Sequence, residues 1–483
     1  MAAIVKTGVQ EFRGLAADSR EVKPGFLFAA LSGSKTDGAR FIEDAVKRGA
    51  AAVLGSAGAA EQAKRLGVRF IAADNPRRRL AELAAEFYGA QPACVAAVTG
   101  TNGKTSVASF LRQIWAFQGR RAASLGTIGI DSPSGHVSLG HTTPDPVRLH
   151  AELARLAHEG VDRLALEASS HGLDQFRLDG VRISAAGFTN ITRDHLDYHA
   201  SFDDYLAAKL RLFSELVTDG GPAVVNADAD HAGDFIATAE KRRLRLLTVG
   251  ARGESLRLVA QDPHRGGQDL IVSYGGRGHR IALPLAGSFQ ASNALVAAGL
   301  ALGLGDPAEQ VFAALATLKG APGRLELVAR TRHGAAIYVD YAHTPDAIET
   351  VLKALKPHVK GRLHIVFGCG GDRDRGKRPL MAAAAARLAD VVILTDDNPR
   401  SEDPAAIRRE ALAGASGARE IGDRAEAIRQ AVAGLHADEA LVIAGKGHED
   451  YQIVGDEVQP FCDRDEAVKV ARALGGAAVS EAA

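Results

Sequence analysis

A glycine-rich loop between an apolar strand and a helix is the feature that most limits what this chain can fold into. The apolar run Ala93 to Thr99 predicts a buried strand, and Lys104 to Phe117 predicts the helix after it. In this arrangement the backbone N–H groups of the loop and the N-terminus of the helix face an anion. The sequence therefore predicts an ATP phosphate site made by the loop residues Gly100, Thr101, Asn102, Gly103, Lys104, Thr105 and Ser106.

The side chains of the loop support this interpretation. Lys104 is placed to neutralise charge on the β- and γ-phosphates, and the Thr105 hydroxyl is placed to bind magnesium. The full Walker pattern needs a glycine where this chain has Val98, so the loop is a shortened variant. A glycine-rich turn entering a helix is the alternative, and the flanking strand and helix favour phosphate binding.

Two glycine- and proline-containing segments divide the sequence. Residues 88–92 (YGAQP) and 320–324 (GAPGR) have the composition of linkers, because Gly and Pro break helices. At 483 residues the chain is too long for one core, and we expect three domains at residues 1–91, 92–321 and 322–483. The middle and last regions alternate strands with helices, which predicts an α/β fold with mostly parallel sheets. Residues 268–285 predict a β-hairpin.

Composition and charge exclude some classes of partner. The 58 basic and 58 acidic residues give no net charge, so we expect no nucleic-acid partner. The three cysteines form no CxxC pair, which favours a reducing compartment. The sequence has neither a signal-peptide stretch nor a run of about 18 apolar residues. We therefore predict a cytoplasmic protein without a membrane span.

Polar residues follow two further strands of the middle region. Glu167 follows the strand candidate 163–166 and could bind magnesium, although a helix cap or a surface charge is the alternative. Residues 188–199 (FTNITRDHLDYH) follow another strand and include His195 and His199. These two histidines could share a helical face as in zinc sites, but magnesium suits a phosphate loop better. Lys209 lies in an amphipathic helix, where periodicity alone predicts a solvated lysine.

Four polar clusters follow strands in the last third of the chain. They are residues 340–346 (DYAHTPD), 368–378 (GCGGDRDRGKR), 396–400 (DDNPR) and 445–450 (GKGHED). Parallel strands bring their carboxyl ends to one edge of a sheet, so we expect these clusters to gather there. Their arginines make the edge basic, which predicts a ligand with carboxylates or phosphates. The alternative is a set of surface turns, for which these residue types are usual.

In this order, the motifs resemble those of the Mur ligase family over nearly the whole chain. The resemblance also includes residues 18–20 (DSR), 142–146 (TTPDP), 167–173 (EASSHGL) and 322–326 (PGRLE). It implies an N-terminal UDP-sugar-binding domain, a central P-loop-type ATPase domain with a mostly parallel sheet, and a Rossmann-like C-terminal domain that binds an amino acid. We expect the protein to be a monomer.

The resemblance also implies roles at the nucleotide. Lys209 would be carbamylated, because adding carbon dioxide to a neutral amine gives an anion that can hold magnesium. Thr105 and Glu167 would hold a first magnesium ion, and His195 would join Lys209 at a second. Lys104, Lys209 and His195 would then be catalytic. The remaining contacts to ATP would come from Asn293, Arg324 and Asp340.

Two substrate-binding sets are implied in the same way. The UDP-sugar peptide would contact Ser19, Ser34, Lys35, Thr36, Thr142, Thr143, Ser169, Gln175 and Arg177. His141 stands where the family often has Asn. The incoming amino acid would contact Arg373, Asp397, Asn398, Pro399, Arg400, Gly445 and Glu449. The DNPR string is associated with meso-diaminopimelate rather than lysine, since Arg400 could pair with the second carboxylate that lysine lacks.

The implied reaction is an ATP-dependent ligation through an acyl phosphate. It would add meso-2,6-diaminopimelate to the D-glutamate of UDP-N-acetylmuramoyl-L-alanyl-D-glutamate. The alternatives are a lysine-adding relative, a ligase like folylpolyglutamate synthase and, from another class, a P-loop switch or motor NTPase. An NTPase of the last kind would hydrolyse ATP without a small-molecule acceptor.

Overall fold

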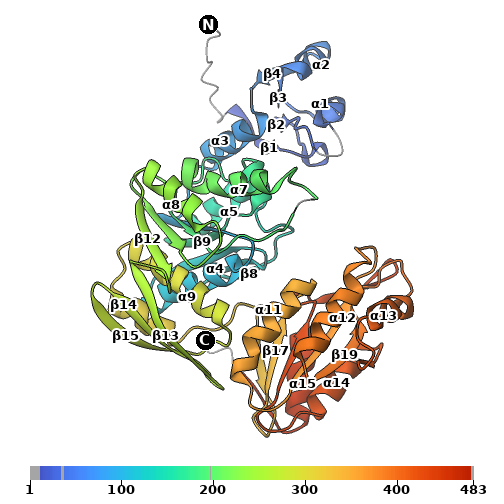
Figure 1. The fold of residues 1–483 in the computed structure, drawn as a ribbon. Coiled ribbons are helices and arrows are strands. Elements are labelled where there is room, and N and C mark those ends of the chain that lie inside the picture. Colours follow the sequence, from blue (N-terminus) through green and yellow to red (C-terminus); the bar gives the residue numbers. More distant parts are fainter. Residues whose placement is uncertain (1–10, 34–36, 196, 480–483) are drawn as a thin grey trace. The chain divides into compact units, whose positions relative to one another are not determined.

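Strands followed by helices organise the chain, as the sequence predicts (Figure 1). The computed structural model describes residues 11–33, 37–195 and 197–479. These residues divide into two units. The first comprises the described residues up to Leu256 with Val296–Val311, and the second comprises Arg257–Leu295 with the described residues from Phe312 onward. The predicted α/β fold class is confirmed, while the domain boundaries at residues 91 and 321 stay a prediction.

The first unit begins with a small parallel sheet. Its strands lie in the order β1 (Gly14–Ala16), β2 (Phe26–Ala29), β3 (Ala52–Gly55) and β4 (Arg69–Ala72). The helices between and after them are α1 (Ile42–Lys47), α2 (Ala60–Arg65) and α3 (Pro76–Tyr88). Helix α3 buries Leu80 and Leu83 against Leu27 and Leu54 of the sheet. This burial of apolar side chains fixes α3 on one face of the sheet.

A larger sheet of the first unit contains the strand before the predicted phosphate loop. Its strands lie in the order β12-β11-β10-β5-β9-β6-β7-β8, parallel from β12 to β6 and antiparallel from β6 to β8. They are β5 (Cys94–Thr99), β6 (Ala122–Gly126), β7 (Gly129–Ser132), β8 (Gly135–Val137), β9 (Arg163–Glu167), β10 (Ile183–Phe188), β11 (Pro222–Asn226) and β12 (Arg245–Gly250). Because β5 lies between β9 and β10, the loops after these three strands meet at one edge.

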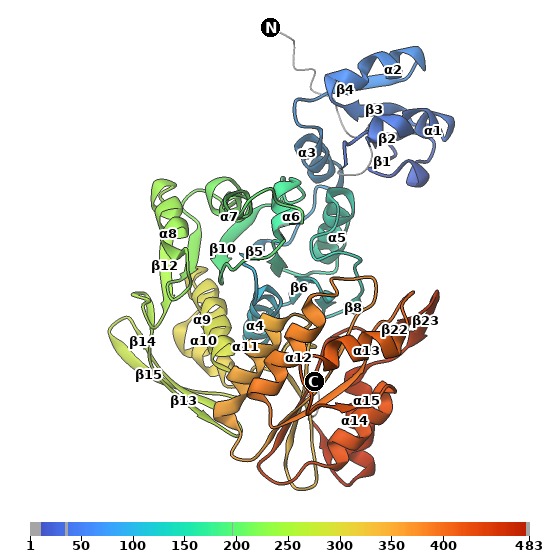
Figure 2. The same ribbon diagram turned by 45° about the vertical axis from the view of Figure 1, so that its right-hand side comes forward.

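Helices cover this larger sheet (Figure 2). They are α4 (Lys104–Phe117), α5 (Pro146–His158), α6 (Ser170–Asp174), α7 (Phe202–Arg211) and α8 (Ala232–Lys241). Helices α5 and α8 share a buried apolar cluster with the sheet, and α4 packs against β6 and β9. The strand and the helix predicted around the phosphate loop are therefore confirmed.

The second unit opens with three strands that follow one another in the sequence. They are β13 (Leu256–His264), β14 (Gly267–Tyr274) and β15 (Arg277–Leu283), of which β14 and β15 form the predicted hairpin. The hairpin turns at Gly275 and Gly276, whose φ angles of 57° and 76° suit glycine. Helices α9 (Ser288–Gly303) and α10 (Ala308–Leu315) follow in the sequence.

The C-terminal sheet of the second unit has the order β20-β19-β18-β21-β17-β16-β24. Strands β19 (Val391–Asp396), β18 (Leu363–Cys369), β21 (Ala440–Ala444) and β17 (Ala336–Asp340) are parallel neighbours. The other strands are β16 (Glu326–Arg330), β20 (Arg419–Glu420), β24 (Ala477–Ala478) and the separate hairpin β22 (Tyr451–Val454) with β23 (Glu457–Pro460). The four parallel strands bring the four polar clusters to one sheet edge, as expected from the sequence.

Helices pack on both faces of the C-terminal sheet (Figure 1). One buried cluster includes α11 (Pro345–Leu355), α12 (Lys377–Leu388) and α13 (Pro404–Leu412). The other includes α14 (Arg424–Ala433) and α15 (Asp463–Ala473). A parallel sheet covered on both faces is the arrangement that continuous apolar strands require.

Several helices in the described part of the chain begin with a capping side chain followed by proline. The pairs are Asn75-Pro76, Asp145-Pro146, Thr344-Pro345 and Asp403-Pro404. Each cap accepts a hydrogen bond from a backbone N–H of the first turn. Proline suits the next position because its missing N–H would have no partner there. These pairs explain why the sequence starts helices at these points.

Two features of composition can be compared with the fold. Among the helices formed by the described residues, none is both long and apolar enough to cross a membrane. The cysteines are free thiols, with Cys94 and Cys369 buried and Cys462 partly buried.

Candidate active site

The predicted phosphate loop lies at the carboxyl end of β5 and leads into α4. Gly100 has a φ of 152°, and a Cβ atom there would lie 1.9 Å from Thr189 Oγ1. Gly103 has a φ of 88° directly before the helix. The two glycines are therefore required by the backbone and by the close approach of the next strand's loop.

The residues that follow β10 hold this loop in place. The N–H of Thr101 donates to the Asn190 carbonyl oxygen at 2.8 Å, and the N–H of Asn102 donates to Asn190 Oδ1 at 3.0 Å. Thr189 Oγ1 donates to the Asn102 carbonyl oxygen at 2.6 Å. Tyr205 adds a hydroxyl contact of 2.8 Å to Thr101 Oγ1. The sequence analysis assigned no role to Thr189 or Tyr205. Thr189 directly follows β10, which was its signal, whereas Tyr205 lies on α7 and had none.

Two lysines meet at one carbonyl oxygen of the loop. Lys104 Nζ donates to the carbonyl oxygens of Gly100 and Thr101 at 2.8 Å each, and Lys209 Nζ donates to the same Gly100 oxygen at 2.7 Å. Lys209 is only 1% exposed, so the solvated lysine that periodicity predicts is wrong. Burial and, secondarily, the charge of Lys104 hold the pKa of Lys209 well below its ordinary value. Lys209 is therefore poised to be a neutral amine.

Glu167 ends β9 beside the loop and is 1% exposed, which excludes the surface-charge alternative. Its carboxylate accepts hydrogen bonds from the N–H of Thr127 at 2.8 Å and from Thr127 Oγ1 at 3.1 Å. A Cβ atom on Gly126 would lie 1.9 Å from Glu167 Oε1. Gly126 and Thr127, neither of which was predicted, therefore fix the direction of this carboxylate.

Three histidines, His171, His195 and His199, lie close to one another in the first unit. The rings of His195 and His199 lie 5.0 and 5.7 Å from that of His171. Burial, followed by the neighbouring imidazoles, lowers the pKa of His171 to about 4, and burial also lowers the pKa values of His195 and His199. Over the described ranges, no group of three or more His, Cys, Asp or Glu side chains could hold a metal ion. The zinc alternative therefore has no cluster to support it in this part of the chain.

Most of the residues predicted to bind the UDP-sugar peptide form a hydrogen-bonded group. Thr143 Oγ1 donates to the Glu167 carbonyl oxygen at 3.0 Å and accepts from Ser169 Oγ at 3.0 Å. Arg177 donates to the Thr143 carbonyl oxygen at 2.6 Å and to Gln175 Oε1 at 2.7 Å. Thr142 Oγ1 lies 3.0 Å from Thr127 Oγ1. This group thus adjoins the Glu167 backbone.

The remaining members of that set lie elsewhere in the sequence. Ser19 is buried in a short 3₁₀ helix of the N-terminal sheet, Ser19–Glu21. Ser34, Lys35 and Thr36 lie outside the described residues.

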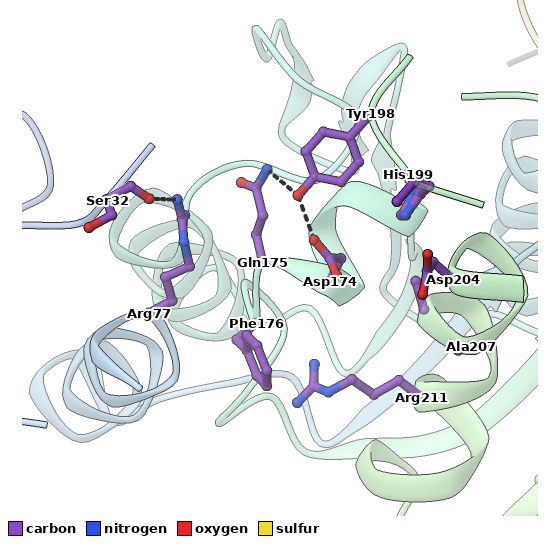
Figure 3. Close-up of a pocket in the computed structure, with 12 residues that line it drawn as sticks. Ser32, Arg77, Asp174, Gln175, Phe176, Tyr198, His199, Asp204, Ala207 and Arg211 are labelled. Carbon is purple, nitrogen blue, oxygen red and sulfur yellow. Dashed lines mark hydrogen bonds between the residues drawn. The ribbon is translucent and has the colours of Figure 1, made fainter. Parts of the chain in front are cut away.

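A pocket of about 630 Å³ opens beside Gln175 (Figure 3). Gln175 Nε2 donates to the Tyr198 hydroxyl, and that hydroxyl donates to the Asp174 carboxylate. Arg77, which also lines the pocket, donates to the Ser32 carbonyl oxygen. His199 also lines it and is 4% exposed, and its Nε2 atom has no hydrogen-bond partner. A pocket with a buried, unpartnered imidazole nitrogen is suited to a polar ligand.

The three residues predicted to complete the nucleotide contacts lie together in the second unit. Asn293 on α9 donates to Gln290 Oε1 at 3.3 Å, and Gln290 donates to the Arg324 carbonyl oxygen at 2.9 Å. The Arg324 guanidinium lies 4.6 Å from the centre of the Tyr341 ring. Asp340 accepts from the N–H groups of Leu325 and Ala342, and burial raises its pKa to about 6.

The residues predicted to bind the amino acid gather at the edge formed by β18, β19 and β21. Asn398 Nδ2 donates to Glu449 Oε2 at 3.1 Å, and a Cβ atom on Gly445 would lie 2.7 Å from Asp397 Oδ2. Arg400, at a φ of 53°, donates to the Gly371 carbonyl oxygen at 2.8 Å. A Cβ atom on Gly370 would lie 3.0 Å from Arg400 Nη1 and 3.8 Å from Arg373 Cγ, so both arginines lie close to this glycine. The carbonyl oxygen of Pro399 lies beside the next residue, Gly371. We call Asp397, Asn398, Arg400 and Glu449 the acceptor cluster.

Comparisons with known proteins agree with these motifs. Residues 11–88 match a family model described as "Mur ligase family, catalytic domain", residues 98–301 match "Mur ligase middle domain", and residues 323–447 match "Mur ligase, glutamate ligase domain". The UDP-N-acetylmuramoyl-L-alanyl-D-glutamate–2,6-diaminopimelate ligase of Bradyrhizobium diazoefficiens is 58% identical over 467 residues, covering 96% of this chain and 95% of the relative.

Solved structures extend the comparison. A structure of a UDP-N-acetylmuramoyl-L-alanyl-D-glutamate–2,6-diaminopimelate ligase is 36% identical, with a TM-score of 0.73 over 96% of this chain and 95% of that one. The MurF ligase of Thermotoga maritima in complex with ADP is 17% identical, with a TM-score of 0.63 over 97% and 99% of the two chains, and shares the fold. On its motifs, its fold and these similarities, this chain belongs to the Mur ligase family.

Proposed function

We propose that this protein is an ATP-dependent ligase that joins meso-2,6-diaminopimelate to the D-glutamate of UDP-N-acetylmuramoyl-L-alanyl-D-glutamate. The observation that carries this proposal is the acceptor cluster, in which Arg400 lies at the same sheet edge as Asp397 and Glu449. Arginine pairs with a carboxylate and the acidic groups pair with an ammonium, so the cluster suits the zwitterionic end of an amino acid. The 58% identical relative with this name supports the same choice.

The reaction has two steps in this proposal. The γ-carboxylate of the D-glutamyl residue attacks the γ-phosphorus of ATP, which gives an acyl phosphate and ADP. An amine of diaminopimelate then attacks the acyl carbon, loses a proton and displaces inorganic phosphate. Lys104, at the start of α4, stabilises the negative charge that develops on the transferred phosphoryl group. The ADP bound in the Thermotoga maritima MurF ligase supports a nucleotide at this fold.

The residues around the loop suit magnesium. The Thr105 hydroxyl and the Glu167 carboxylate are oxygen donors, and magnesium commonly takes one or two carboxylates together with substrate phosphates. Carbon dioxide added to the neutral amine of Lys209 would supply a second anionic group, beside which we place His195. Magnesium bound there would neutralise phosphate charge.

The setting of the reaction follows from its substrates. We propose that it takes place in the cytoplasm, where ATP is available and where three free thiols are stable. Its product would be a precursor of peptidoglycan, and we propose that the enzyme works as a monomer.

Replacing Gly126 by Ala is expected to reduce activity at low magnesium by about 30-fold, within the 10–100-fold range typical of residues that orient metal ligands. The new Cβ atom would displace the Glu167 carboxylate, from which it would be 1.9 Å distant. The measurement is initial rate against magnesium concentration. Gly233→Ala is the control, because a Cβ atom there meets nothing within 4 Å. A normal magnesium dependence in Gly126→Ala would contradict the role of Glu167.

A competition assay tests the function itself. Purified enzyme receives ATP, the UDP-sugar dipeptide and equal concentrations of diaminopimelate and lysine, and the products are separated by mass. We expect diaminopimelate to be incorporated, and Arg400→Ala to reduce its kcat/KM about 100-fold, as the loss of a charge-assisted pair predicts. Arg409→Ala, on the exposed side of α13, is the matched control.

Two of the rival functions have distinct outcomes in this assay. Preferential lysine incorporation would identify the lysine-adding relative. ATP hydrolysis that is independent of both the UDP-sugar dipeptide and the amino acid would identify a switch or motor NTPase.

A further inference from the structure

Lys446 is a buried cation that the proposed reaction does not use. It lies in the loop after β21, and its side chain has no exposed surface. Burying an ammonium group is costly unless opposite charges and hydrogen-bond acceptors surround it. The groups that surround Lys446 are therefore informative about why the chain retains it.

Within the described residues, the side-chain polar contacts of Lys446 are made with members of the acceptor cluster. Its Nζ atom lies 3.2 Å from Asn398 Oδ1, 3.4 Å from Glu449 Oε2 and 3.9 Å from Asp397 Oδ1. The Tyr451 ring centre lies 5.6 Å away. One ammonium group thus contacts the loop after β19 and the loop after β21 at the same time.

The hairpin β22–β23 extends this network to Arg400. The N–H of Ile453 donates to Asn398 Oδ1 at 2.9 Å, so this oxygen serves both Ile453 and Lys446. The N–H of Arg400 donates to the Ile453 carbonyl oxygen at 3.1 Å, and the N–H of Gly455 donates to the Arg400 carbonyl oxygen at 2.8 Å. Lys446 therefore connects the acidic members of the cluster to the backbone that holds Arg400 at its positive φ.

The charges of the cluster require such a group. Asp397 and Glu449 are both acidic and lie around the same ammonium group, and in its absence like charges would push their loops apart. Together with Arg400, Lys446 gives the site two basic groups beside the two carboxylates. Acidic and basic groups side by side suit a ligand that carries both an ammonium and a carboxylate.

We propose that Lys446 is a positioning residue for the amino-acid substrate, whose charge holds Asp397, Asn398 and Glu449 in the arrangement that receives the substrate's ammonium group. The proposal rests on the proposed function, because it takes the acceptor cluster as the amino-acid site. Lys446 itself makes no contact with the reacting atoms in this proposal.

The test compares three KM values in Lys446→Met and Lys446→Gln. Met keeps the length of the side chain without its charge, and Gln also keeps a hydrogen-bond donor. We expect both variants to raise the KM for diaminopimelate at least tenfold and to leave the KM values for ATP and the UDP-sugar dipeptide within about twofold. The rise in melting temperature that diaminopimelate causes, which requires no turnover, should shrink in parallel.

Glu439→Gln is the matched control. Glu439 is also buried, but it pairs with Arg362 and His364 at the amino ends of β18 and β21, away from the acceptor cluster. We expect it to lower the melting temperature and to keep the KM for diaminopimelate within about twofold. If Lys446→Met does not fold, the Gln variant and its ligand-induced melting shift decide the matter.

Several outcomes would overturn the proposal. A normal KM for diaminopimelate in Lys446→Gln would show that the charge is not needed. Equal increases of all three KM values would show a general structural role. A wild-type enzyme that incorporates no diaminopimelate would refute the proposed function first, and this outcome is distinguishable because it appears before any substitution.

Discussion

Replacing Lys104 by Ala is expected to lower kcat for the complete reaction about 10³-fold, equivalent to roughly 4 kcal/mol of transition-state stabilisation. Lys104 is the first residue of α4, and its ammonium group lies over the loop through contacts with the Gly100 and Thr101 carbonyl oxygens. The measurement is release of ADP and phosphate with all three substrates present.

The control for this substitution is Lys241→Ala, at the exposed C-terminus of α8. We expect its activity to be normal, because it removes the same charge far along the chain from the phosphate loop. Turnover in Lys104→Ala close to that of the control would refute ATP activation by this loop. Circular dichroism and the melting temperature of both variants would show that the fold is retained.

Replacing Lys209 by Met is also expected to lower kcat about 10³-fold, because the anion proposed to hold magnesium at the phosphates would be lost. A readout independent of activity is available. Wild-type protein equilibrated with ¹³C-labelled carbon dioxide should give one carbamate resonance by NMR, and Lys209→Met should lack it. Absence of the resonance from the wild-type protein would refute the carbamate.

The carbamate should have a characteristic pH dependence. Only a neutral amine attacks carbon dioxide, and burial with the charge of Lys104 lowers the pKa of Lys209. A lowered pKa means that, at any given pH, a larger fraction of Lys209 is neutral than of an ordinary exposed lysine. The labelled signal should persist to lower pH than that of an exposed lysine and should disappear as the pH falls through the lowered pKa. A signal that appeared only at the pH where an exposed lysine loses its proton would contradict the burial argument.

The sequence was sufficient for features that depend on local pattern. The strand, loop and helix around Gly100 follow from apolar runs and glycine positions, and the structure has them where they were expected. The gathering of the four polar clusters at one edge could be predicted because parallel strands end on one side of their sheet. The pairing of Arg375 and Arg378 with Glu402 and Glu410, which reduces the basic character of that edge, could not. The association of Thr143 with Ser169 and Gln175 came from the family resemblance alone.

What could not be predicted depends on packing between distant segments. Lys209 lies on a helix whose periodicity allows a solvated position, and only contact with the Gly100 carbonyl oxygen shows that it is buried. In the sequence, Gly126 is an ordinary glycine at the end of a strand. Its role becomes visible only in the structure, where Glu167 of the neighbouring strand lies against it. Lys446 is similar, because a lysine between two glycines in a polar loop is usually solvated. Each of these depends on a contact between residues that are far apart in the sequence.

The attachment of the phosphate loop to the residues after β10 has a thermodynamic consequence. Fixing the backbone of one residue costs about 1–2 kcal/mol of conformational entropy at room temperature. In this protein, hydrogen bonds with Thr189 and Asn190 fix Thr101 and Asn102 through contacts within the chain itself. The loss of conformational entropy of these residues therefore occurs when the protein folds. Binding of the nucleotide does not have to order them again. The affinity for ATP thus depends partly on the stability of the neighbouring strand β10, which makes no predicted contact with the nucleotide.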